Sequence, residues 1–351
     1  MSEEKQRFQE HLDRVSRSFA FCIRELSEPF RQEVSLAYLL FRILDTIEDT
    51  QWESLSKQRA AFRVFNDFLL RPPSADQVSD WLDKFPAGVS KSDAFLLGDS
   101  AWVFEKYWGL SDEIRRVLEK HLQNALRGMR HFVVRAKNGK EISNLKELNS
   151  YCFFVAGVIG EYLSENYAVH VKGYDWQKHR RESYHFGLFL QKINILKDQL
   201  GDQKEGRLFV YDRKEVLKSL SDHAEHALKY ILSLPQPRDS YALFCAWSFF
   251  LGLASVPAIE KRWQSQDASI KISRAQTLEV LARVKWSLRR DQSLKELYAE
   301  KSLYLKDLTK DWSLSKEKKK TPSTEGVSMG QLYEGVLDSK DLEQLNLALD
   351  L

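Results

Sequence analysis

Three stretches of the chain carry apolar residues on nearly every face of a helix, at residues 34–47, 151–167 and 186–200. Such helices need protein on most sides, so they belong at the centre of a large helical protein or around a central cavity. The chain of 351 residues contains only 15 Gly and 8 Pro and shows no regular alternation of polar and apolar residues. We therefore expect an all-α protein whose long helices are joined by short turns.

Turn-rich breaks divide the chain up to residue 308 into segments of helical length, and no internal repeat is evident. We predict a single all-helical domain over residues 1–308. A lysine-rich run followed by Thr-Pro-Ser-Thr predicts a flexible, solvated linker over residues 309–330. The leucines of residues 331–351 predict a short amphipathic C-terminal helix that packs on the body, binds a partner or touches a membrane surface.

The charge of the chain identifies no polyanionic partner. Its 53 basic and 50 acidic residues leave a net charge of only +3, so nucleic acid is not implied. The three cysteines lie in apolar stretches and lack the spacing of a metal or redox pair, as in the reduced core of a cytosolic protein. They are Cys22, Cys152 and Cys245.

The N-terminus is polar and acidic and has no apolar segment typical of a signal peptide, which predicts a cytoplasmic protein. Residues 241–259 come nearest to a membrane span, but they include Gly252 and Pro257 and follow a turn-rich segment. A helix that is apolar all round is also what the centre of a large helical protein requires. We expect a buried core helix here and no transmembrane segment.

An acidic cluster of Asp45, Glu48 and Asp49 lies at the end of the first apolar run. Carboxylates three and four residues apart share one helix face, and Tyr38 and Arg42 precede them on that face. Buried charges are tolerated mainly when they are paired or bound to metal. Hard divalent cations such as Mg²⁺ prefer oxygen ligands and keep room for phosphate oxygens. Taken alone, such a pattern is more often a solvated helix face.

A second polar stripe lies on the third apolar run, where Gln191, Asn194, Asp198 and Asp202 follow each other at spacings of three, four and four. Two such stripes, each on an apolar helix, are harder to explain as solvated faces than one. We predict that the two clusters face each other and hold Mg²⁺ for the departure of a diphosphate.

Two further sequence patterns can each be interpreted in two ways. Ser16, Arg17 and Ser18 precede an apolar helix and suit a phosphate, although a serine there is also an ordinary N-cap. Small residues at Ala156 and Gly157, and again at Gly160, indicate either close helix packing or a groove for a long hydrocarbon chain.

His223 and His226 lie in a polar helical segment with no further metal ligand near them in the sequence, which indicates a solvated helix face. The sequence contains no HExxH, no P-loop and no GxGxxG. Neither a zinc protease nor a familiar nucleotide-phosphate loop is therefore supported, although a nicotinamide cofactor can be bound by another fold.

Five blocks of sequence resemble, in order and spacing, the squalene/phytoene synthase family over roughly residues 14–290. The blocks are Ser16–Phe19, Tyr38–Asp49, Tyr151–Gly157, Leu188–Asp198 with Gly206–Phe209, and Phe244–Ala246 with Ile270–Gln276. The last block resembles the branch of the family that uses NADPH.

The resemblance implies an isoprenoid-synthase helical fold around a large central cavity. It further implies that two farnesyl diphosphates condense head to head through presqualene diphosphate, followed by NADPH-dependent reduction to squalene. Mg²⁺, with Mn²⁺ as a substitute, and NADPH are the implied cofactors. Peripheral association with a membrane for release of an apolar product is left open.

The resemblance also implies roles for individual residues. The implied metal ligands are Asp45, Glu48, Asp49, Asn194, Asp198 and Asp202. The implied diphosphate contacts are Ser16, Arg17, Ser18, Arg42, Gln191, Asn194 and Arg207. Tyr38 and Tyr151 are implied catalytic residues beside the departing diphosphate, with Asp45, Asp49, Asp198 and Asp202. Lys271 and Arg274 are the implied cofactor contacts.

Four positions depart from the family pattern, namely Lys197, Gly201, Ser248 and Ser273. Ser248 and Ser273 lie in stretches associated with reduction, so the residues support the condensation more strongly than the reduction. Two alternatives therefore stay open: a non-reducing synthase of the dehydrosqualene or phytoene type, and a catalytically idle helical protein that binds prenyl diphosphates.

Overall fold

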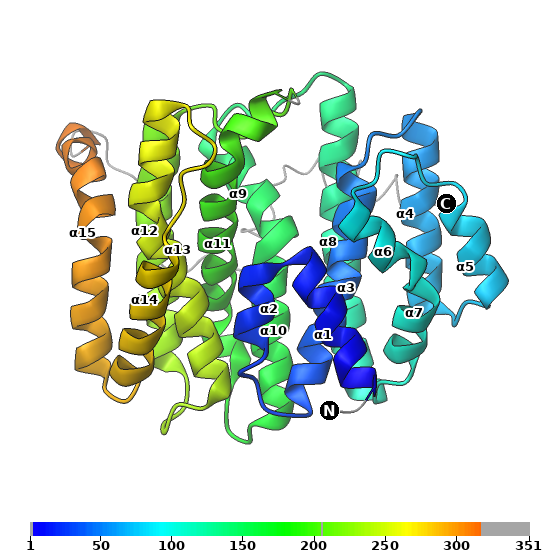
Figure 1. Ribbon diagram of the computed structural model, residues 1–351, viewed down its shortest axis with the longest axis horizontal. Helices are drawn as coiled ribbons and strands as arrows, with labels where there is room; N and C mark the ends of the chain where they lie inside the picture. The colour runs from blue at the N-terminus through cyan, green and yellow to red at the C-terminus, as the bar shows by residue number, and fades with distance from the viewer. Residues whose placement is uncertain (1–2, 205, 317–351) are drawn as a thin grey trace. The chain divides into compact units, whose positions relative to one another are not determined.

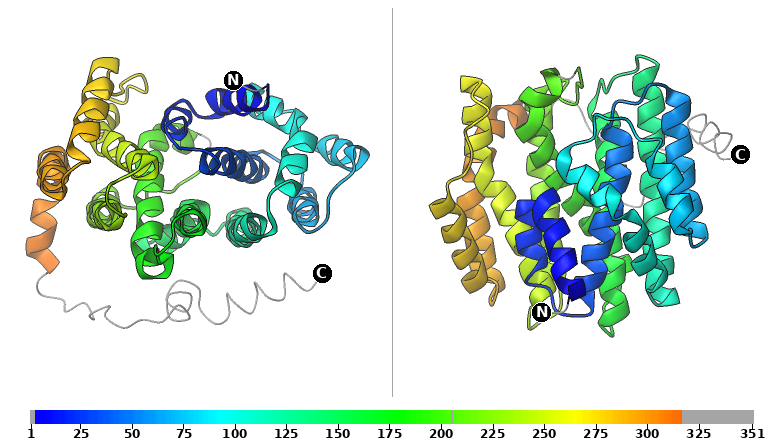
Figure 2. Two further views of the ribbon diagram at one scale, coloured as in Figure 1. Left: turned by 90° about the horizontal axis from the view of Figure 1, so that it is seen from below. Right: turned by 45° about the vertical axis from the view of Figure 1, so that its right-hand side comes forward.

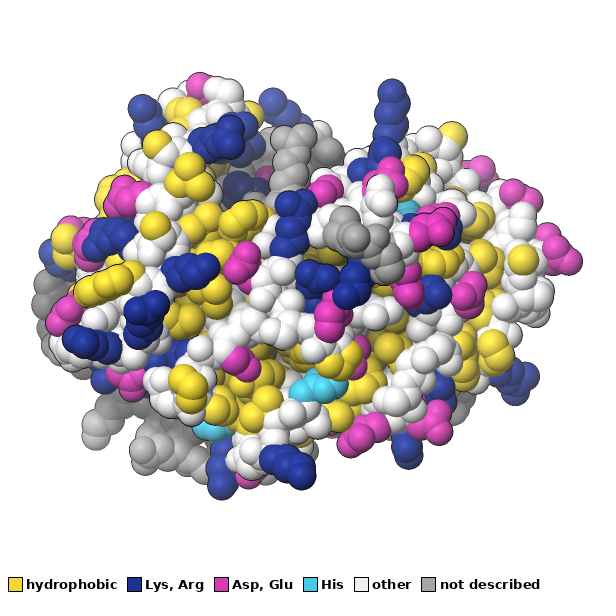
Figure 3. Space-filling view, turned by 60° about the horizontal axis from the view of Figure 1, so that its bottom comes forward, with side chains coloured by type: hydrophobic (Ala, Val, Ile, Leu, Met, Phe, Trp, Pro, Cys, Tyr) yellow, Lys and Arg dark blue, Asp and Glu magenta, His cyan; other side chains and the backbone are white. Residues whose placement is uncertain are grey.

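A computed structural model describes residues 3–204 and 206–316 of the chain, apart from the side chains of residues 17–18 and 311–316. Every regular element in these ranges is a helix, and they contain no strand, so the predicted all-α class is confirmed (Figure 1). The surface drawn in Figure 3 mixes basic and acidic side chains, in line with the small net charge.

The helices pack into two compact units, which we describe separately. The first unit comprises the described residues up to Gly139, together with Val158–Arg180 and Pro235–Ser248. The second comprises Lys140–Gly157, Arg181–Leu234 and the described residues from Phe249 onward. The prediction of a single domain over residues 1–308, and that of a central cavity, stay predictions.

The first unit is built around α3 (Phe30–Asp49), which packs against α1, α4, α6, α8 and α10 (Figure 2). Leu39, Leu40, Ile43 and Ile47 of α3 are completely buried, as the apolar run predicts. Its other helices are α1 (Glu3–Val15), α2 (Arg17–Ile23), α4 (Leu55–Leu70), α5 (Ala75–Leu82), α6 (Lys91–Gly98), α7 (Ser100–Trp108), α8 (Asp112–Lys137) and α10 (Val158–His170).

Several helices of the first unit have a serine as their N-cap. Ser54, Ser74, Ser90 and Ser111 each accept a hydrogen bond from a backbone N–H in the first turn of α4, α5, α6 and α8. These N–H groups have no partner inside the helix, so each cap stabilises its helix by about 1 kcal/mol.

The second unit contains α9 (Leu145–Cys152), the π-helix η1 (Phe153–Gly157), α12 (Arg213–Ser233), α14 (Arg274–Ser287) and α15 (Asp291–Lys316). Helices α11 (Trp176–Lys204) and α13 (Ser240–Ser265) have residues in both units. Because α15 continues to Lys316, the predicted linker is wrong for residues 309–316, which are helical. The rest of the predicted linker and the predicted helix at 331–351 lie outside the described residues.

Helix α13 is long and apolar enough to cross a membrane by length and composition alone. However, 72% of its most apolar window is buried within the protein. Residues such as Tyr241, Phe249 and Phe250 have at most 1% of their surface exposed. This burial supports the interpretation of residues 241–259 as a core helix.

Helix α11 approaches the π-helix η1 so closely that only glycine fits at Gly187. A Cβ atom there would overlap the carbonyl oxygen of Ala156 and lie 2.7 Å from its carbonyl carbon. A Cβ on Gly157 would lie 2.8 Å from Cδ1 of Leu188. Gly157 therefore serves close helix packing, one of the two interpretations that the sequence left open, while Ala156 takes part through its backbone.

Candidate active site

The first acidic cluster occupies the last turns of α3, where Asp45 and Glu48 are half-buried and Asp49 is exposed. The C-terminal end of a helix carries a partial negative charge, and the last turn of α3 contains no basic residue to offset it. Carboxylates placed at this end repel one another and the helix carbonyls. The arrangement therefore favours a bound cation.

Burial raises the pKa of Asp45 to about 7, with Asp49 and Asp93 adding to the rise, although the charge of Arg42 opposes it. A carboxylate in this position gains from a positive charge beside it. The metal-ligating atoms that α3 presents at this end are carboxylate oxygens, which suit Mg²⁺ and Mn²⁺ better than softer metals. The chemistry of these side chains therefore fits the implied Mg²⁺ or Mn²⁺.

Arg42 is held by a partner that the sequence patterns did not reveal. Its Nε and Nη2 donate to the two carboxylate oxygens of Asp93 on α6, at 2.8 and 3.1 Å. Ser90, the N-cap of α6, donates to the same carboxylate at 2.6 Å. Burial lowers the pKa of Arg42, but its hydrogen bonds to Asp93 and the charge of Asp45 outweigh that effect and raise it. Arg42 is thus a fixed positive charge beside Asp45.

Tyr38 lies on the same face of α3, close to the start of α2. Burial raises the pKa of its hydroxyl, although a hydrogen bond with Ser16 and the charge of Arg42 oppose the rise. Ser16 caps α2, accepting from the backbone N–H of Phe19 at 3.4 Å. The N-cap interpretation of Ser16 is therefore confirmed, while the side chains of Arg17 and Ser18 are outside the description.

Two buried side chains fix the end of α3. The indole N–H of Trp52 and the amide of Gln58 both donate to the carbonyl of Ile47, each at 2.9 Å. Gln58 also donates to the carbonyl of Glu48 at 3.0 Å. These bonds hold the turn that carries Glu48 and Asp49. The sequence signal was weak, because Gln58 lies among the polar residues that begin α4 and has no distinctive spacing.

The second polar stripe lies on α11, where Asp198 is exposed and Asn194 and Asp202 are half-buried. Lys197 contacts two expected metal ligands, with its Nζ 3.2 Å from Oδ1 of Asn194 and 3.3 Å from Oδ2 of Asp198. The ammonium group occupies the negative potential of these oxygens, as a metal ion would. Gln191 is half-buried on the same helix.

Asp202 and Arg207 are brought together by the turn after α11. Their side chains form an ion pair at 3.1 Å, and the backbone N–H of Arg207 donates to the carbonyl of Asp202 at 2.8 Å. Gly206 adopts φ of +75°, which favours glycine at that position of the turn. Gly201, where the family pattern has an acid, is exposed, and a Cβ there would meet nothing within 4 Å.

Tyr151 is buried near the end of α9, and its ring stacks on Phe209 with the centroids 4.9 Å apart. The π-helix η1 follows directly after α9. Single π-turns of this kind are uncommon and often mark functional sites. The stack connects two blocks of the family pattern, one at Tyr151 and the other at the turn after α11.

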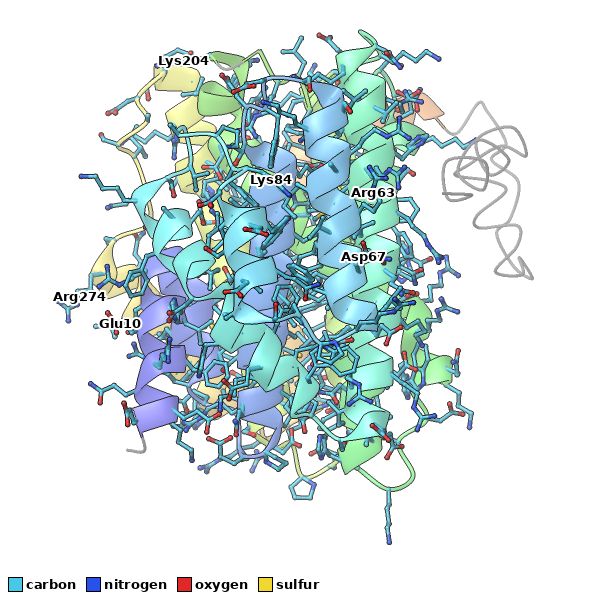
Figure 4. The ribbon with its side chains drawn as sticks, turned by 90° about the vertical axis from the view of Figure 1, so that its right-hand side faces the viewer. Glu10, Arg63, Asp67, Lys84, Lys204 and Arg274 are labelled. Atoms are coloured by element: carbon cyan, nitrogen blue, oxygen red, sulfur yellow. The ribbon has the colours of Figure 1, made fainter. Side chains whose placement is uncertain are left out.

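Lys271 and Arg274 flank the start of α14 and are exposed. The side chain of Arg274 points away from the ribbon in Figure 4. Between them, Ser273 caps α14 in a capping box with Gln276, which gives this departure from the family pattern a structural role. A helix N-terminus beside two cations suits the phosphate of a cofactor such as NADPH.

The two acidic clusters fall in different units, and their facing each other stays a prediction. Among the described residues, no group of three or more His, Cys, Asp or Glu could hold a metal ion by itself.

A model of the squalene/phytoene synthase family matches residues 12–211. The chain belongs to this family. The squalene synthase of Schizosaccharomyces pombe is 28% identical over 298 residues, which cover 77% of this chain and 63% of that protein. The squalene synthase of Homo sapiens is 27% identical over 301 residues, covering 77% of this chain and 67% of the relative. The chain thus spans less than two thirds of the Schizosaccharomyces pombe relative.

Solved structures share the fold of this family member. A structure of TcSQS with the ligand BPH1237 has a TM-score of 0.69 at 21% identity and covers 98% of each chain. A dehydrosqualene synthase in complex with a ligand has a TM-score of 0.57 at 16% identity, covering 82% of this chain and 96% of the other. The predicted isoprenoid-synthase fold is confirmed.

This family member also contains a buried polar cluster that the sequence interpretation missed. The prediction of a solvated face is wrong for His223, which has 5% of its surface exposed. Its Nδ1 lies 2.7 Å from Nδ1 of His185, whose ring stacks on His226. Lys192 donates to Asn149 Oδ1 at 2.5 Å and to Ser219, and burial lowers its pKa to about 8. Cross-helix contacts of this kind leave no local spacing in the sequence.

The histidine pair predicts loss of stability in acid. Burial lowers the pKa of His185 to about 2 and that of His223 well below its usual range. The unfolded chain takes up protons below about pH 6.5 and the folded cluster resists them, so stability is lost as the pH falls. We expect the free energy of unfolding to drop by about 2 kcal/mol or more between pH 7 and 5. Urea titrations at several pH values measure this free energy. For the double variant His185→Gln/His223→Gln it should fall less steeply with decreasing pH, and an unchanged pH dependence would contradict the prediction.

Proposed function

We propose that the chain is a squalene synthase-like prenyltransferase that condenses two farnesyl diphosphates head to head through presqualene diphosphate and reduces the product to squalene with NADPH. The observation that carries the proposal is the acidic end of α3, where Asp45 lies between Arg42 and Asp49 on an oxygen-rich helix end. Family membership over residues 12–211 supports it.

The proposed condensation begins with ionisation of an allylic diphosphate. Asp45, Glu48 and Asp49 on α3, and Asn194, Asp198 and Asp202 on α11, are the proposed metal ligands. Mg²⁺ bound there would neutralise charge on the departing diphosphate. The allylic cation is then attacked by the double bond of the second substrate, which gives the cyclopropyl intermediate after loss of a proton.

The chain's own cations and hydroxyl groups would orient the diphosphate. Arg42, held rigidly by Asp93, offers a fixed charge beside the acidic end of α3. Ser16 and Tyr38 share the neighbouring surface, and a tyrosine with a raised pKa keeps its proton as a hydrogen-bond donor. We assign Arg207 and Gln191 to the second diphosphate, and Tyr151 to the intermediates.

The proposed reduction needs a hydride donor. NADPH would supply the hydride when bound, and Lys271 and Arg274 at the start of α14 are the proposed contacts for its phosphates. The capping box of Ser273 and Gln276 fixes the direction of the helix N-terminus. This step has less support than the condensation, because Ser273 supplies no charge.

Incubation of the purified chain with farnesyl diphosphate and Mg²⁺, with and without NADPH, tests the proposal. Products are identified by mass spectrometry, and released diphosphate is measured separately. We expect squalene only when NADPH is present, and loss of all diphosphate release on chelation of the metal, with recovery on adding Mg²⁺ or Mn²⁺. A conjugated triene formed without NADPH would favour the non-reducing alternative. Absence of diphosphate release from any prenyl diphosphate would favour the idle binding protein.

The remaining parts of the proposal concern location and partners. We propose a cytoplasmic protein with peripheral association at a membrane, because a hydrocarbon product has no stable place in water. Fractionation of cells expressing the chain checks this. Release of the protein from membranes by salt supports peripheral attachment, whereas a requirement for detergent would point to α13 as a span.

A further inference from the structure

Helix α14 is apolar on two opposite faces. One face, with Val280, Leu281 and Val284, is buried in the second unit. The other carries Leu278, Ala282 and Trp286 at spacings of four, so these side chains lie along one line. Leu278 is 57% exposed and Trp286 is 71% exposed. A soluble helix normally turns one apolar face inward and a polar face outward, so the second face needs an explanation.

The outer face of α14 continues onto α15. Ala282 and Trp286 line a pocket of about 520 Å³ between the two helices, to which α15 contributes the buried Leu297 and the carboxylates Glu296 and Glu300. On α15, Tyr304 and Leu308 are 39% and 38% exposed and lie four residues apart on one face of the helix. We call Leu278, Ala282, Trp286, Tyr304 and Leu308, all of which are exposed, the outer apolar face. On the left of Figure 3, hydrophobic, basic and acidic side chains share the surface.

The charge around the outer apolar face is strongly positive. Residues 271–310 contain ten Lys and Arg and five Asp and Glu, a net charge of +5 that exceeds the +3 of the whole chain. Lys285, Arg289 and Arg290 are exposed and form no ion pair within the part of the chain that the structure describes. Glu300 in the pocket is neutralised by Arg283 and Lys301, at 2.5 and 3.2 Å.

We infer that the outer apolar face docks this protein on an anionic lipid bilayer, with the hydrocarbon side chains entering the headgroup region and the basic residues contacting lipid phosphates. Exposed tryptophan and leucine beside unpaired Lys and Arg match the chemistry of an interfacial helix. The placement of Trp286 suits the bilayer interface, where its ring prefers to lie. The inference rests on the peripheral membrane association proposed above and names the surface that makes it, but it does not need the proposed reaction.

Co-sedimentation of the full chain with phosphatidylcholine vesicles, prepared with and without phosphatidylglycerol, tests the inference. We expect binding to the anionic vesicles and its loss at high salt. The double variant Leu278→Ser/Trp286→Ser should raise the lipid concentration for half-binding about tenfold. Lys285→Ser and Arg289→Ser should each raise it about fivefold at low salt. Lys271 and Arg274, assigned to the cofactor, are left unchanged.

Matched control variants distinguish binding through this face from nonspecific binding of the protein to vesicles. Leu70→Ser removes an apolar side chain of α4 that is 48% exposed, and Lys137→Ser removes an exposed lysine of α8. Neither variant should change binding to the vesicles. Equal binding by wild type and the α14 variants would overturn the inference. The inference would also be overturned if the protein did not bind vesicles but self-associated, and the α14 variants abolished that self-association. Binding gained only after deletion of residues 317–351 would assign the face to that segment and would also overturn it.

Discussion

Replacing Asp45 by Asn is expected to lower the rate of diphosphate release by about a thousandfold or more, because it removes a charge from the proposed metal cluster. Asn keeps the size of the side chain and one carbonyl oxygen, so packing around α3 should be preserved. Loss of the charge also removes the carboxylate beside Arg42. The effect should therefore fall on metal-assisted ionisation and leave folding intact.

Diphosphate release from farnesyl diphosphate, measured over a range of Mg²⁺ concentrations, checks this prediction. Asp198→Asn should have a similar effect if the second cluster shares the chemistry. The matched control is Asp67→Asn, an exposed carboxylate on α4 that Figure 4 labels, which should retain the wild-type rate. Thermal melts confirm that each variant is folded. A folded Asp45→Asn protein with near-normal release would remove α3 from the proposed site.

The secondary structure was predictable because its signals are local. Apolar residues on all faces of residues 34–47 and 186–200 predict central helices, and these runs belong to α3 and α11. The acidic stripes were predictable for the same reason, since a spacing of three or four fixes a shared helix face. The end of α15 was missed because the lysine-rich run that suggested a linker begins only at Lys316, where the described helix ends.

The partners of these residues were not predictable, because they come from distant parts of the chain. Asp93 pairs with Arg42 across 51 residues. Glu33, buried on α3, accepts from Asn166 at 3.0 Å and lies 2.7 Å from His170, more than 130 residues away. His223 looked solvated because its sequence neighbours are polar. Its burial depends on α11, which supplies His185. Only tertiary packing decides which helical face turns inward.

The largest effect on stability is expected for Gly187→Ala, which should lower the free energy of unfolding by about 3 kcal/mol. The added Cβ would overlap the backbone carbonyl of Ala156, and a backbone atom in a helix cannot rotate away. Gly157→Ala should cost less, because its Cβ would meet the side chains of Leu188 and Phe153, which can shift more easily than a backbone carbonyl. Chemical denaturation of the two variants gives the comparison.

Gly201→Ala is the matched control, since it lies on α11 as well and its Cβ would meet nothing within 4 Å. Alanine has the better helix propensity, so this change should leave the stability equal or raise it by up to about 1 kcal/mol. Equal stability for the Gly187 and Gly201 variants would show that α11 does not need the close approach. If the Gly157 variant instead kept its stability and lost affinity for farnesyl diphosphate, Gly157 would belong to a hydrocarbon groove, and the packing interpretation would fail at that position.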